Sequence, residues 1–232
     1  MPPPEDIRGV KYPNRCQQTE QARQQSQDKE PPTKGKIQTD MHHLILPGWQ
    51  NSGPLHWQSL WETQLSAQRV EQHDWMRPLR GDWITRLEDH VLSIDERSAQ
   101  QICRAEAQNN HKNDKETRKK DLILIAHSLG CHLTAAWAAL SKQTHRIQGA
   151  LLVAPPELKS WRPPVLQKLP FPSICVISSN DPFCELQPGK EMAAAWGSSL
   201  VELGDRGHIN AESGLGAWPQ GLELIAQLAK ST

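Results

Sequence analysis

The sequence has no excess of charge of either sign. Its 232 residues include 26 Lys and Arg and 26 Asp and Glu, so the formal net charge is zero. Proteins that bind nucleic acid or anionic lipid usually present a basic patch, because phosphate groups supply much of the binding energy. We therefore expect no nucleic-acid partner and no membrane partner.

Long apolar runs and paired cysteine motifs are also missing. No segment approaches the roughly 20 apolar residues that cross a bilayer, and the first residues are polar and proline-rich, unlike a signal peptide. The five cysteines are odd in number and lack CxxC spacing, which argues against a disulfide framework or a zinc site. We expect a cytoplasmic protein with reduced thiols.

Apolar periodicity is absent from residues 1–40. They are rich in Gln, Lys, Arg, Glu and Pro and cannot bury enough surface to offset the entropy lost on ordering. We expect a disordered polar tail, followed by a single domain over residues 41–232. An interaction tail, or translation starting at Met41, are alternatives. A polar stretch at about residues 95–120 is interpreted as an insertion, a helix extension followed by an exposed loop.

From Met41 onward, strand-like and helix-like segments alternate. Short apolar runs predict strands at residues 43–46, 69–73, 122–126, 150–154, 173–178 and 200–203. Helical spacing of apolar residues predicts helices between them, one of them capped by Asp82, and Pro188 and Pro219 open the last two. This alternation predicts an α/β fold with about six mainly parallel strands and helices on both faces. Residues 155–172 are too few to hold a cap domain.

The central motif is Ala126-His127-Ser128-Leu129-Gly130, which lies between the strongest strand and a good helix. This is the context of a nucleophile elbow, G-x-S-x-G, in which the residues two before and two after the serine must be small. Ala126 departs from the usual first glycine but is small. The alternative is an ordinary turn in which Ser128 caps the helix. We interpret Ser128 as a nucleophile, with the helix N-terminus facing the site of the oxyanion.

Two further residues can complete a triad in the chain order Ser, acid, His. Asp181 follows the strand at 173–178, and His208 follows the strand at 200–203, so both belong to the carboxyl edge of the sheet. Asp205 is an alternative acid, but it shares the loop of the histidine. We expect His127 to point away from the site at the sharp turn. No histidine has the spacing of a metal ligand, so we expect no metal.

The oxyanion hole needs two backbone N–H groups. The candidates are Leu129, directly after the nucleophile, and Trp49, in the Pro47–Gly53 loop after the first strand, where Gly48 permits close approach. A plain glycine-rich loop is the alternative for Trp49.

Four segments carry a more specific resemblance: LPGWQ, AHSLG, SNDPFC and GHINAESGLGAWPQG, the last at residues 207–221. Together they resemble the YdeN-like, retinoblastoma-binding-protein-nine family of small serine hydrolases, over about residues 41–232. The resemblance implies the α/β-hydrolase fold, esterase-like activity and a triad of Ser128, Asp181 and His208. Residues 1–40 and the polar insertion have no counterpart in it.

The sequence therefore predicts a serine hydrolase that cleaves small or short-acyl esters through an acyl-enzyme, with no cofactor. Two alternatives remain open: an acyltransferase on the same fold, and a partner-binding protein with a vestigial hydrolase site. The natural substrate and the oligomeric state do not follow from the residues.

Overall fold

The computed structural model describes residues 41–106, 120–158, 161 and 163–231, with only the backbone for residues 95–106. The predicted polar tail at residues 1–40 and part of the polar insertion, residues 107–119, lie outside the described residues. The fold below is that of the unit formed by Asp40–Thr232.

A six-stranded sheet forms the centre of this unit, with the strand order β2-β1-β3-β4-β5-β6. All five pairs of neighbouring strands are parallel, as the alternating pattern predicts. The central strands β3, β4 and β5 are buried at every residue, which explains their continuous apolar sequence. The strands are β1 (His42–Leu46), β2 (Gln68–Arg69), β3 (Leu122–His127), β4 (Ile147–Val153), β5 (Ser173–Ile177) and β6 (Ser199–Glu202).

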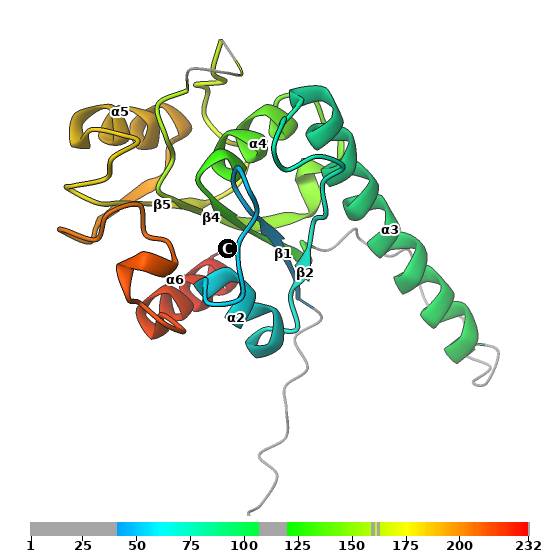
Figure 1. The fold of residues 1–232 in the computed structure, drawn as a ribbon. Helices are drawn as coiled ribbons and strands as arrows, with labels where there is room; N and C mark the ends of the chain where they lie inside the picture. Colours follow the sequence, from blue (N-terminus) through cyan, green and yellow to red (C-terminus); the bar gives the residue numbers. More distant parts are fainter. Residues whose placement is uncertain (1–40, 107–119, 159–160, 162, 232) are drawn as a thin grey trace, which may run out of the picture. The chain divides into compact units, whose positions relative to one another are not determined.

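Helices cover both faces of the sheet (Figure 1). On one face lie α3 (Arg80–Glu106), α4 (Leu129–Ala138) and α5 (Leu186–Trp196), and on the other lie α2 (Trp57–Gln64) and α6 (Pro219–Lys230). Each face has its own apolar core, and six tryptophans are almost fully buried in them: Trp57, Trp61, Trp83, Trp137, Trp196 and Trp218. Among the described residues, no helix has the length and apolar character needed to cross a bilayer.

Three local expectations were wrong. Helix α5 begins at Leu186, so Pro188 is its third residue and does not open it. The predicted strand at 69–73 is shorter than expected: β2 is Gln68–Arg69, and the N–H of Val70 donates a further bond to Ile45 of β1. The strand stops there because β2 is an edge strand with a single neighbour and the chain turns polar and exposed at Glu71. Asp82 does not cap α3: the helix begins at Arg80, so Asp82 lies in the first turn, where its charge still favours the helix dipole.

The parallel sheet places the carboxyl ends of all strands at one edge. The loops after β1, β3, β5 and β6 therefore meet there, although the ends of β1 and β6 are 156 residues apart in the chain. These four loops carry the residues singled out by the sequence.

Candidate active site

Ser128 occupies a sharp turn between β3 and α4. Its backbone has φ 54° and ψ −123°, a region that non-glycine residues rarely adopt. The turn needs small neighbours: a Cβ added at Gly130 would lie 2.1 Å from the carbonyl oxygen of Leu46, and one added at Gly48 would lie 2.6 Å from Cβ of Ser128. The turn thus exposes the serine hydroxyl above the sheet edge.

Three predicted side chains lie in one hydrogen-bonded row. His208 Nε2 lies 2.9 Å from Ser128 Oγ, and His208 Nδ1 lies 3.0 Å and 2.9 Å from the two carboxylate oxygens of Asp181. The side chain of Asp181 is only 3% exposed and that of His208 10% exposed. In this row the carboxylate accepts the Nδ1 proton, so Nε2 of a neutral imidazole is free to accept the serine proton.

The loops that carry Asp181 and His208 are bonded to each other. Ser178 Oγ donates to the carbonyl of Gly204 and accepts the N–H of Arg206, and Asn180 Oδ1 accepts the N–H of Gly207. Each bond is 2.7–2.9 Å long. The loop after β5 therefore sets the position of the loop after β6.

The alternative acid, Asp205, lies elsewhere in this pair of loops. Its Oδ1 accepts a 2.6 Å hydrogen bond from the hydroxyl of Ser179, and the bond is exposed. No contact with His208 is found for Asp205 among the described residues. The geometry favours Asp181.

The two N–H groups suggested for an oxyanion hole flank Ser128. Leu129 is the first residue of α4, and Trp49 follows Gly48, which is packed against Ser128. Neither N–H donates to a backbone acceptor in the described part of the chain. The indole of Trp49 is 52% exposed, and its Nε1 donates to the carbonyl of Met76 at 3.0 Å.

Two residues beside the base were missed in the sequence. His127 was expected to point away, yet its ring lies 4.9 Å from that of His208, and Phe183 lies on His208 with ring centroids 4.5 Å apart. The alternation of β3 held a signal for His127, because residues 123, 125 and 127 share the face that α2 and α6 cover. Phe183 carried no such signal.

Buried groups around the row are held uncharged. Burial lowers the pKa of His56 to about 4 and lowers that of His127 well below its usual value. Burial also raises the pKa of Cys175 and Cys184 to about 12 and raises that of Cys131. These thiols stay protonated near neutral pH, which makes them poor nucleophiles.

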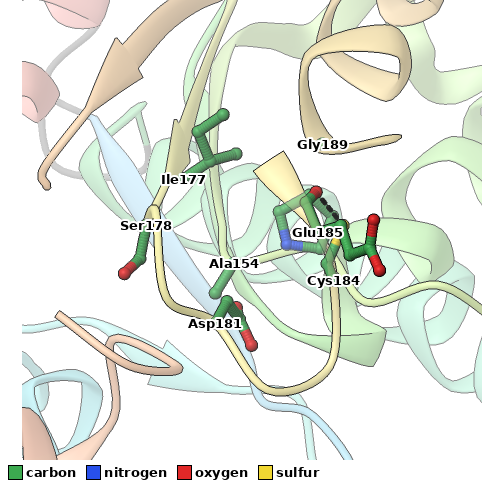
Figure 2. Close-up of a pocket in the computed structure, with 8 residues that line it drawn as sticks. Ala154, Ile177, Ser178, Asp181, Cys184, Glu185 and Gly189 are labelled. Carbon is green, nitrogen blue, oxygen red and sulfur yellow. Dashed lines mark hydrogen bonds between the residues drawn. The ribbon is translucent and has the colours of Figure 1, made fainter. Parts of the chain in front are cut away.

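Figure 2 shows a small pocket that includes Asp181 but neither Ser128 nor His208. Its polar lining comes from the segment after β5 that carries Asp181. The pocket is lined by Ala154, Pro155, Ile177, Ser178, Asp181, Cys184, Glu185 and Gly189.

Within the described residues, no group of three His, Cys, Asp or Glu side chains is arranged to hold a metal ion.

The family model described as "Serine hydrolase" matches residues 43–100 and 101–227. No curated protein matched the sequence.

Similar solved structures include three bacterial proteins. A YdeN-like hydrolase of Pectobacterium atrosepticum is 27% identical with a TM-score of 0.66, and the match covers 83% of this chain and 92% of that one. The ydeN gene product of Bacillus subtilis is 16% identical, with a TM-score of 0.57 and coverage of 81% and 98%. A hydrolase of the α/β superfamily from Xanthomonas campestris is 17% identical, with a TM-score of 0.52 and coverage of 84% and 99%. The α/β-hydrolase fold is thus confirmed.

Proposed function

Because the chain belongs to the serine hydrolase family and is similar to YdeN-like hydrolases, we propose that it cleaves small or short-acyl esters with Ser128 as nucleophile, His208 as base and Asp181 as the acid that orients the base. The observation that carries the proposal is the row of hydrogen bonds from Asp181 through His208 to Ser128 Oγ.

In the first step, His208 Nε2 takes the hydroxyl proton of Ser128 as Oγ attacks the ester carbonyl carbon. The carbonyl oxygen becomes an oxyanion, and the free N–H groups of Leu129 and Trp49 are the donors suited to hold it. The imidazolium is stabilised by the buried carboxylate of Asp181. It then protonates the leaving alcohol, which departs and leaves an acyl group on Ser128.

In the second step, His208 takes a proton from water, and the resulting hydroxide attacks the acyl carbon. A second oxyanion forms and collapses, and Ser128 Oγ leaves with the proton from His208. The enzyme returns to its starting state, and the acid product is released. Apart from the ester and water, the cycle needs no group outside the chain.

The substrate class follows from the short connection between β4 and β5. Only residues 154–172 separate these strands, and the loop they form is too short to build a separate cap over Ser128. Both Ser128 and His208 are partly exposed. A site without a cap in this connection suits a small ester or a short acyl chain.

The test is labelling by a fluorophosphonate probe, followed by a panel of chromogenic esters of increasing acyl length. Ser128→Ala should abolish labelling and lower turnover by many orders of magnitude while the protein stays folded. Ser93→Ala, in α3 and away from the strand ends, is the matched control and should label like the wild type.

Retained turnover above about a tenth of the wild-type value in Ser128→Ala would refute the role of Ser128. A folded wild-type protein that neither labels nor turns over any ester would identify a vestigial site. Formation of a new ester or amide when alcohols or amines are added would show acyl transfer instead of hydrolysis.

A further inference from the structure

The residue before the nucleophile lies behind the base. His127 ends β3, and its side chain is buried on the α2 face of the sheet. Its Nε2 lies 2.9 Å from the backbone carbonyl oxygen of His208. A carbonyl only accepts, so His127 carries its proton on Nε2 and donates it to the main chain of the base. The side chain of His127 thus links strand β3, which ends directly before Ser128, to the loop after β6 that carries His208.

The loop after β6, which carries His208, has a strained backbone that the bond from His127 helps to hold in place. Ile209, directly after His208, has φ 49°, a left-handed conformation that a β-branched residue adopts only when its surroundings hold it there. Two side chains bond the carbonyls of this dipeptide: His127 bonds that of His208, and Trp57 Nε1 bonds that of Ile209 at 2.8 Å. Both donors come from the same face of the sheet.

The ring of His127 also packs against the base. The imidazole of His208 contacts two rings: that of His127, at 4.9 Å, and that of Phe183, at 4.5 Å between ring centroids. His56 in turn packs edge-on against His127 at 4.7 Å. Burial keeps His127 uncharged, so it presents a fixed neutral donor and adds no positive charge beside the imidazolium that forms on His208.

We propose that His127 is a positioning residue for the base: its Nε2–H holds the His208 carbonyl, and thereby keeps the imidazole in line between Asp181 and Ser128. The inference rests on the proposed function. His127 touches neither the substrate nor the reacting atoms, so it acts only through His208.

The test uses two polar substitutions of His127 that differ in reach. In His127→Gln the amide nitrogen lies about as far from the backbone as Nε2 of histidine, so the bond to His208 can form. In His127→Asn the side chain is one bond shorter and cannot reach. We expect His127→Asn to lower kcat about tenfold or more with KM nearly unchanged, because small misplacement of a catalytic group is costly, and His127→Gln to stay within about threefold of the wild type.

His132 provides a matched control in the same protein. It is also a buried, neutral histidine, and its Nε2 also bonds a backbone carbonyl, that of Pro156, at 2.8 Å. That carbonyl belongs to the loop after β4 and not to the base. His132→Asn should lower the melting temperature about as much as His127→Asn does, but leave kcat within about twofold.

A second readout does not depend on turnover. The Nδ1 proton of His208, shared with Asp181, should give a downfield proton NMR signal in the wild type and in His127→Gln, and the signal should broaden or vanish in His127→Asn. If the wild-type protein turns over no ester but shows this pattern, the proposed function fails and the positioning role stands. The inference is overturned if folded His127→Asn keeps wild-type kcat and signal, if His127→Gln is equally impaired, or if His132→Asn is as slow as His127→Asn.

Discussion

Replacing Asp181 by asparagine should impair the base through its proton position. Oδ1 of Asp181 accepts the N–H of Phe183 at 2.9 Å, so the amide oxygen of an asparagine takes this place. The amide NH₂ then takes the place of Oδ2, which lies 2.9 Å from His208 Nδ1. A donor at that position favours Nδ1 as acceptor, with the imidazole proton on Nε2, over the weaker alternative in which Nδ1 donates to the amide oxygen at the place of Oδ1, 3.0 Å away. His208 can then no longer accept the proton of Ser128.

The magnitude follows from the burial of the pair. The carboxylate of Asp181 is 3% exposed and the imidazole of His208 10% exposed, so solvent screens their interaction little. Removing one partner of a buried charge pair costs roughly 3–5 kcal/mol, which corresponds to a loss of about 10²- to 10⁴-fold in kcat at 1.36 kcal/mol per tenfold. The imidazolium exists only after proton transfer, so the loss should appear in kcat and leave KM little changed.

The matched control is Asp205→Asn in the neighbouring loop. Asp205 is exposed and accepts a bond from Ser179, which an amide oxygen can also accept, so the loss should be less than about tenfold. The assay is steady-state ester hydrolysis at several pH values, with folding checked by circular dichroism. If Asp205→Asn is the more damaging change in a folded protein, the acid is misassigned, although the Ser128–His208 pair could still stand.

Two further predictions concern close packing and acid stability. Gly48→Ala should slow fluorophosphonate labelling at least about tenfold, because the added Cβ would lie 2.6 Å from Cβ of Ser128. Gly53→Ala is the control and should label normally, because a Cβ added at this position of the same loop meets no atom within 4 Å. Equal labelling rates for the two variants would refute the argument. The free energy of unfolding, measured in urea, should be largest above pH 6.5 and should fall toward pH 4. The fall should reach up to about 1.4 kcal/mol per histidine per pH unit, because the unfolded chain binds protons that the folded chain excludes. Equal free energies of unfolding at pH 7.5 and pH 5 would contradict this prediction. The histidines whose pKa burial lowers to about 4 are His43, His56 and His132.

The fold was predictable where burial alone decides the structure. Strands β3, β4 and β5 are buried on both faces, so their sequences are continuous apolar runs with few alternatives. At the sheet edge this signal disappears. The extent of β2 depends on how many backbone N–H and C=O groups of β1 are available for pairing along that edge. The sequence of residues 69–73 does not contain that information.

The candidate site was predictable for a related reason. Candidates that follow separate strands of a parallel sheet must meet at its carboxyl edge, and Ser128, Asp181 and His208 do lie in one row there. The surroundings of His208 depend instead on the path of the loop after β6. This loop returns over the α2 face and brings its backbone onto His127, and no local pattern in residues 204–209 predicts that path.

The strained backbone of Ser128 affects which substitutions at this position would stabilise the protein. A non-glycine residue held at φ 54° and ψ −123° costs roughly 1–3 kcal/mol, and a glycine there would relieve that cost while removing the hydroxyl. Stability and activity therefore favour different residues at this position. Selection of random variants for heat resistance alone would tend to discard the proposed nucleophile, so a screen for more stable forms of the protein has to require turnover as well.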